Sequence, residues 1–122
     1  MDFKALISPE TYADSEPVGI GAIEAMRLPG PLPYDSFSYI PEPLWQRILS
    51  LGTAYSLHFS QIAEPIIDTV LDQTQCQWFE SELEFLSRTV VDPAAIEAIR
   101  TVLNVVSRVA HAPSLRLVIS PP

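Results

Sequence analysis

The sequence has few of the residues that staple or activate a small protein. Its single cysteine, Cys76, cannot form an internal disulfide, and its two histidines are His58 and His111. A cysteine nucleophile needs a neighbouring imidazole, a zinc site needs three or four ligands, and helical di-metal sites use a Glu-x-x-His spacing. The chain shows none of these spacings. We therefore predict no catalytic residue, no metal site and no cofactor, and we expect the protein not to be an enzyme.

The sequence also lacks a phosphate-binding loop. It has only four glycines, and its nearest approach to such a loop is Gly19-Ile20-Gly21. The third glycine of the dinucleotide fingerprint is replaced by Glu24, whose negative charge would repel a phosphate. We therefore expect no nucleotide site there.

Positive charge is scarce as well. The chain has 7 Lys and Arg against 15 Asp and Glu, giving a formal net charge of -8, and only 18% of its residues are charged. Surplus negative charge repels a nucleic-acid backbone and steers a protein toward basic surfaces. Because 48% of the residues are hydrophobic, we expect some apolar surface to be buried in an oligomer, such as a homodimer, or against a partner. The sequence thus predicts a basic protein partner and no nucleic acid.

Long hydrophobic runs are missing. The longest charge-free run, residues 48–63, has 16 residues and is interrupted by polar side chains, whereas a bilayer span needs roughly 18 to 20 apolar residues. The segment MDFKALISPE has no basic start followed by an apolar run, so export by a signal peptide is not expected. We predict that the protein does not enter a membrane and that it is cytoplasmic.

Proline is concentrated on the N-terminal side of the chain. The length of 122 residues predicts a single domain over residues 1–122. Seven of the twelve prolines lie within residues 1–43, and each fixes φ and removes a backbone donor. Residues 1–43 are therefore predicted to be an extended segment that wraps the core. Within it, residues 18–28 are predicted to form a short helix, and residues 29–43 to cover the core with Leu32, Tyr34, Phe37, Tyr39 and Ile40.

Residues 44–112 are predicted to form a helical core. The first helix begins near Pro43 or Leu44, and Pro65 is expected to end or kink it near Ala63. His58 in this helix is expected to be a core histidine, and Trp78, like Trp45, is expected to be core too. The apolar stripe of the helix recurs at three- and four-residue steps and consists of Trp45, Ile48, Leu49, Gly52, Tyr55, Phe59, Ile62 and Ala63.

Two further helical stretches are predicted. Residues 64–88 form the second, which bends or breaks within residues 73–77 because its apolar face changes side there. The third begins at Asp92-Pro93, a capping side chain followed by proline at the first helical position. It has a regular apolar stripe, made by Ile96, Ile99, Val102, Leu103, Val106, Val109 and Ala110.

The tail, residues 113–122, is predicted to be extended. Residues 114–120 have strand composition, and a strand there needs a partner in the N-terminal arm or in a second chain. The predicted fold class is therefore mainly α, a small bundle of three to five helices wrapped by the proline-rich N-terminal segment, with a short C-terminal strand.

Acidic residues gather in residues 64–88, which contain six carboxylates and no basic side chain before Arg88. A solvated polar face, which every amphipathic helix has, is the plainer interpretation. However, like charges on a helix cost roughly a few tenths of a kcal/mol per pair, and no base in the stretch offsets them. Carboxylates so spaced can offer a docking strip to the lysines and arginines of a partner. We predict partner binding by Glu64, Asp68, Asp72, Glu80, Glu82 and Glu84.

The sequence does not fix a reaction, so three functions stay open. We predict a non-catalytic, acidic protein-protein interaction module that binds a basic partner protein. Immunity proteins and other toxin-neutralising inhibitors share its small size, acidic charge and lack of catalytic motifs. The first alternative is a structural or assembly subunit of a homo- or hetero-oligomer. The second is a small ligand-binding protein or enzyme with a site between helices near Tyr55, His58 and Glu64.

Overall fold

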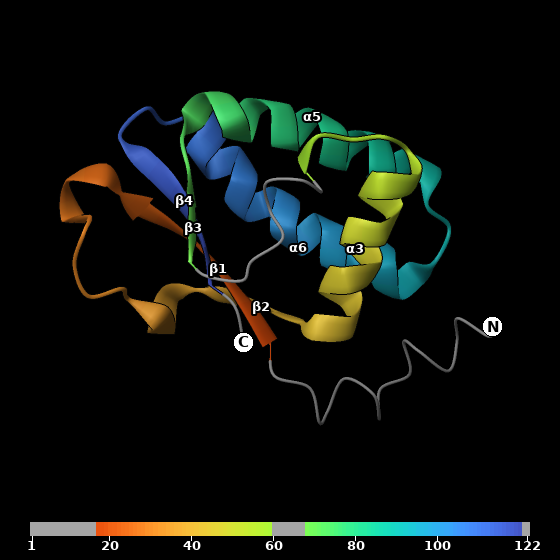
Figure 1. The fold of residues 1–122 in the computed structure, drawn as a ribbon, viewed down its shortest axis with the longest axis horizontal. Helices are drawn as coiled ribbons and strands as arrows, with labels where there is room; N and C mark the ends of the chain where they lie inside the picture. The colour runs from red at the N-terminus through yellow and green to blue at the C-terminus, as the bar shows by residue number, and fades with distance from the viewer. Residues whose placement is uncertain (1–16, 60–67, 121–122) are drawn as a thin grey trace.

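The computed structural model describes residues 17–59 and 68–120. It shows three helices packed against a four-stranded antiparallel sheet with strand order β2-β1-β4-β3 (Figure 1). The predicted fold class, a mainly α helical bundle, is therefore wrong, because two segments expected to be helical pair into the sheet. The strands are β1 (Pro17–Glu24), β2 (Ser38–Pro41), β3 (Thr69–Leu71) and β4 (Leu115–Ser120), and the helices are α3 (Glu42–Ala54), α5 (Gln73–Thr89) and α6 (Pro93–Ala110).

The centre of the sheet is formed by the two strands nearest the ends of the described chain. β1 pairs with β4 over six residues, from Gly19 opposite Ser120 to Glu24 opposite Leu115. The predicted strand at residues 114–120 is thus confirmed, and its partners lie in the same chain. The short helix predicted at residues 18–28 is wrong, because β1 fills most of that range and is followed by the 3-10 turn η1 (Ala25–Arg27).

Two glycines in β1 leave room for the ring of Phe37 to approach the backbone of the strand. A methyl group on Gly21 would lie 2.5 Å from the ring of Phe37, and one on Gly19 would lie 3.1 Å from the same ring. Without these methyl groups the Phe37 ring packs directly on the sheet, on the face opposite the helices. The Gly-x-Gly spacing is therefore a packing feature of a strand.

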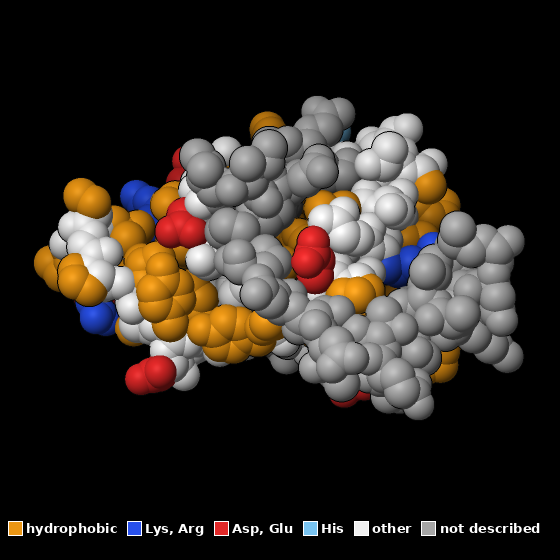
Figure 2. Space-filling view, turned by 60° about the horizontal axis from the view of Figure 1, so that its bottom comes forward, with side chains coloured by type: hydrophobic (Ala, Val, Ile, Leu, Met, Phe, Trp, Pro, Cys, Tyr) orange, Lys and Arg blue, Asp and Glu red, His pale blue; other side chains and the backbone are white. Residues whose placement is uncertain are grey.

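The segment between β1 and β2 covers part of this second sheet face. Phe37 packs there with Ile23 and Val118, and the 3-10 turn η2 (Tyr34–Ser36) precedes it. Figure 2 shows apolar side chains gathered at the end of the molecule where this segment lies. Of the side chains expected to lie across the helices and cover the core, Ile40 is buried in that core. Phe37, with Leu32 against it, lies on the opposite sheet face instead, and Tyr34 and Tyr39 are 46% and 47% exposed.

Helix α3 ends earlier than expected. Ser56 adopts a left-handed backbone with φ of 59°, and the N–H of Leu57 donates to the carbonyl of Gly52 at 2.7 Å. This is the hydrogen-bond pattern of a helix C-terminus closed by a left-handed residue. The helix therefore stops at Ala54, and the end predicted near residue 63 lies outside the described residues.

The stretch 64–88 contains a strand and a helix, where one bent helix was expected. Val70 and Leu71 pair with Val118 and Leu117 of β4. The Asp72 side chain then caps α5 by accepting the N–H of Gln75 at 2.9 Å, while the Gln75 side chain accepts the N–H of Asp72. The bend or break predicted within residues 73–77 is therefore wrong, because α5 runs through them without interruption and the change from strand to helix lies at Asp72.

Helix α6 matches the prediction. Asp92 caps it, Pro93 is its first residue, and it ends at Ala110. It contacts the other two helices as well as β1 and β4. Its buried side is dominated by Ile99, Val102, Val105, Val106 and Val109.

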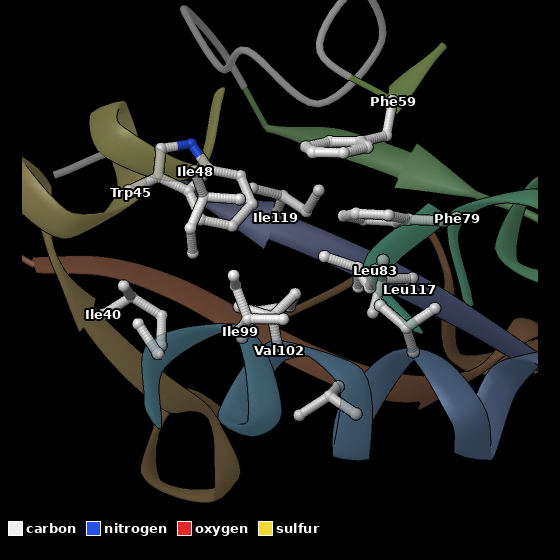
Figure 3. Close-up of a cluster of buried hydrophobic side chains, with 14 of the residues drawn as sticks. Ile40, Trp45, Ile48, Phe59, Phe79, Leu83, Ile99, Val102, Leu117 and Ile119 are labelled. Carbon is white, nitrogen blue, oxygen red and sulfur yellow. The ribbon is translucent and has the colours of Figure 1, made fainter. Parts of the chain in front are cut away.

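The core lies between the helices and the sheet and draws side chains from every layer (Figure 3). The rings of Phe59 and Phe79 stack with centroids 5.0 Å apart, which brings the chain after α3 onto α5. Trp45 is completely buried, as predicted. The other large, fully buried side chains are Ile20, Ile48, Leu83, Leu86, Ile99, Leu117 and Ile119.

Candidate functional site

The six predicted partner-binding carboxylates do not form one strip. Glu64 lies outside the described residues. Asp68, just before β3, accepts a hydrogen bond from the Ser120 hydroxyl at 3.0 Å, and Asp72 is the cap of α5. Both side chains thus serve donors within their own chain, although both residues remain exposed.

Glu80 and Glu82 point to opposite flanks of α5. Residues two apart on a helix differ by about 200°, which leaves these two carboxylates about 160° apart. Glu80 faces α6, where it accepts the Ser107 hydroxyl and lies 3.3 Å from Nε2 of His111. Glu84 is exposed, and its spacing of four residues places it on the Glu80 flank. The fold therefore separates the carboxylates, and partner binding by the whole set stays a prediction.

Glu82 anchors the chain that follows α3. Its Oε2 accepts the backbone N–H of His58 at 2.7 Å, and its Oε1 accepts the N–H of Phe59 at 3.0 Å. Hydrogen bonds to a charged group are worth about 1.5–3 kcal/mol each. The Glu82 side chain is only 13% exposed, and Nδ1 of His58 lies 3.5 Å from its Oε2. A negative charge is thereby held just beneath the surface.

His58 itself is at the surface, since 78% of its side chain is exposed. The expectation of a core histidine is wrong because α3 ends before it, so the helical stripe on which the expectation relied does not reach His58. By contrast, His111 lies directly after α6, as its C-terminal capping residue.

Four aromatic side chains lie together on the Glu82 flank of α5, and we call them the aromatic face: Tyr55, His58, Trp78 and Phe85. Tyr55 meets Phe85 edge to face, with centroids 5.4 Å apart. The His58 and Trp78 rings are 6.4 Å apart and tilted by 44°. Tyr55 is 45% exposed, Trp78 62% and Phe85 38%. Such large exposed rings on neighbouring elements form an apolar surface patch.

The exposure of Trp78 contradicts the prediction that it belongs to the core. The buried side of α5 is made by Cys76, Phe79, Leu83 and Leu86. Trp78 precedes Phe79 by one residue and is therefore turned about 100° away from that side. Sequence reasoning missed the aromatic face because it depends on where α3 ends, although Trp78 and Phe85 share a seven-residue spacing that places them on one flank.

A hollow of about 290 Å³ opens on this flank, lined by His58, Trp78, Ser81 and Glu82. One wall is the indole of Trp78, and the Glu82 carboxylate lies at the lining with part of its acceptor capacity used by the two backbone N–H groups. The hollow thus combines an aromatic surface with a nearly buried negative charge.

The cysteine and the other possible metal ligands form no reactive site in the described part of the chain. Cys76 is fully buried, and burial, followed by the charges of Asp72 and Glu80, raises the pKa of its thiol to about 12. Because the thiolate is the reactive form of cysteine, this thiol is inert at neutral pH. Within residues 17–59 and 68–120, no group of three or more His, Cys, Asp or Glu could hold a metal ion.

A second hollow, also of about 290 Å³, lies on the sheet face opposite the helices. Among the residues that the structure describes, its lining is mainly apolar, including Leu28, Leu32 and Val118, and Asp68 is the one charged member. Val70 of the edge strand β3 contributes to it and is 50% exposed. This surface has apolar character without a polar group arranged for chemistry.

None of the helices in the described part of the chain is long and apolar enough to span a membrane. Comparison with known proteins found no family model, no curated protein and no solved structure that matches this chain.

Proposed function

We propose that this protein is a non-catalytic module that binds a basic partner protein through its aromatic face. The observation that carries the proposal is the large exposure of Trp78, which shares one flank of α5 with the exposed Phe85 and with Glu82. Tryptophan and tyrosine are enriched at protein interfaces and supply many of the residues that dominate binding energy. A solvent-facing tryptophan on an otherwise well-packed helix has no role in the core, so a binding role accounts for its position.

Charge supports the choice of partner. The net charge of -8 raises the rate of encounter with a positively charged protein and lowers it for an acidic one. Glu82 lies within the aromatic face, and Glu84 is exposed on the other flank of the same helix. Asp72 and Glu80, in contrast, serve the cap of α5 and the contact with α6. Neutralisation of a basic toxin or enzyme is the specific form of binding that the small size and acidic charge favour.

Site-specific photo-crosslinking tests the proposal. A photoreactive phenylalanine analogue is introduced at position 78 or 85, and at position 39 as a control, because Tyr39 is similarly exposed but lies on β2. In the native host, positions 78 and 85 should capture the same basic protein, and capture should weaken as ionic strength rises. Equal capture from position 39, or capture that does not depend on salt, would contradict the proposal.

The second hollow favours a second candidate, a subunit of an oligomer. Val70 is exposed on the edge strand β3, and unpaired strand edges readily accept another strand. Association through this edge would bury apolar surface, as expected for a chain with 48% hydrophobic and only 18% charged residues. Light scattering at micromolar concentration distinguishes the two: an oligomer that a Val70→Lys variant converts to a monomer supports this candidate, and a wild-type monomer rejects self-association.

A further inference from the structure

We propose that the hollow beside Trp78 is a receptor for a single arginine side chain of the partner. This inference rests on the proposed function and specifies it, because it names the group of the basic partner that is recognised. The lining residues in the described part of the chain are His58, Trp78, Ser81 and Glu82, which come from α5 and from the chain that follows α3. The site therefore exists only in the folded protein.

Counting only donors in residues 17–59 and 68–120, the Glu82 carboxylate in the hollow has unused binding capacity. A carboxylate can accept about four hydrogen bonds, and Glu82 accepts two from backbone N–H groups. Its side chain is 13% exposed, so water screens it poorly. In the described part of the chain, His58 is the basic side chain recorded within 4.0 Å of it, and that side chain is mostly in solvent. A cation that enters the hollow would therefore meet a charge that is fixed in place.

The aromatic wall selects the kind of cation. Indole is the most favourable ring for a cation–π contact, and the planar guanidinium of arginine stacks on it while keeping its N–H donors free at the edges. Those donors match the remaining lone pairs of the Glu82 carboxylate. A lysine ammonium is more strongly hydrated and cannot stack, so arginine fits the pair formed by Trp78 and Glu82 better.

The hollow is large enough to hold one arginine side chain. Its volume of about 290 Å³ accommodates the guanidinium and its apolar stem but not a folded segment. The hydroxyl of Ser81 adds a further acceptor at the lining. The apolar stem would lie against the aromatic face, where long basic side chains commonly bury their methylene groups.

A titration of the full chain with small probes tests the inference without the partner. N-acetyl-arginine methylamide is added to ¹⁵N-labelled protein, and the indole N–H of Trp78 and the amide of Ser81 are followed by NMR. The matched probes are the citrulline derivative, which has nearly the same shape without the charge, and the lysine derivative. Saturable shifts at both reporters are expected for arginine, with an affinity at least about tenfold above that for citrulline and several-fold above that for lysine.

Two protein variants complete the test. Trp78→Ala should abolish the arginine-specific shift at Ser81 while leaving the fold intact, because the ring is largely exposed. Glu84→Gln removes a charge from the same helix but the other flank, and should leave the arginine affinity within about twofold of wild type. Equal shifts with citrulline and arginine, or an unchanged arginine affinity in Trp78→Ala, would overturn the inference.

The outcome separates this inference from the proposed function. If a basic protein is captured from position 78 but the arginine probe behaves like citrulline, the arginine receptor is rejected and the binding module stands. If the probe binds as expected but positions 78 and 85 capture no basic protein, the hollow recognises the guanidinium and the proposed function is rejected.

Discussion

Replacement of Gly21 by alanine tests how β1 and the segment after it pack together. The added methyl group would lie 2.5 Å from two ring atoms of Phe37 and 3.0 Å from the ring carbon that joins the side-chain stem. The whole ring must move, and it is only 7% exposed. Overpacking of this kind costs about 1–3 kcal/mol. The loss of glycine entropy in the unfolded chain offsets roughly 0.4–1 kcal/mol of it, so we expect a net destabilisation of about 1–2 kcal/mol.

A double-mutant cycle identifies the cause. Phe37→Ala alone should cost about 3 kcal/mol, the lower end for a buried phenylalanine, because its cluster is small. In Gly21→Ala/Phe37→Ala the clash is gone, so the free energy of unfolding should equal or slightly exceed that of Phe37→Ala. Urea unfolding monitored by circular dichroism measures all four proteins. Additive losses, or a Gly21→Ala protein within about 0.5 kcal/mol of wild type, would refute the packing described for this face.

Three further changes have defined outcomes. Cys76 should resist alkylation in the folded protein at pH 8 and react in urea. Its thiol has a pKa of about 12 in the folded protein instead of 9.0, so its contribution to the free energy of unfolding should be constant below about pH 9 and should fall between about pH 9 and pH 12. A Cys76→Ala control subtracts the contribution of the other titrating groups. Ser56→Gly should stabilise the protein by up to about 1 kcal/mol in urea unfolding, since Ser56 has φ of 59°. Asp72→Ala should cost about 1 kcal/mol through loss of the α5 cap; no change in either variant would contradict the described helix ends.

Local signals in the sequence were sufficient for some elements. Asp92-Pro93 marks the start of α6, and its apolar stripe fixes the buried side. The strand composition of residues 114–120 marks β4. In these cases the pattern that forms the element lies within the element itself, so no distant residue has to be known.

Other elements depend on residues far away in the chain. Gly19 and Gly21 lower the helix and strand propensity of β1, and the sequence does not show that the ring of Phe37 packs against them. The three residues of β3 fit a helical spacing equally well, and only their pairing with β4 makes them a strand. The fold class was wrong for this reason, because the missing strands are the ones stabilised by long-range contacts.

The candidate site was predicted in part. Glu82 was among the predicted binding residues and lies in the hollow, but the grouping with Glu80 failed because the two point to opposite flanks of α5. Trp78 and His58 were assigned to the core. The exposure of His58 follows from the early end of α3 at Ala54, where a left-handed serine closes the helix. The exposure of Trp78 follows from its position about 100° away from the buried side of α5.

The most direct measurement for the proposed binding face is the dissociation constant of the partner captured from position 78. It is determined by calorimetry for the wild-type protein, Trp78→Ala and Tyr39→Ala. The account predicts that Trp78→Ala weakens binding at least about tenfold, or about 1.4 kcal/mol, while Tyr39→Ala stays within about twofold. Equal affinity of all three proteins would contradict it.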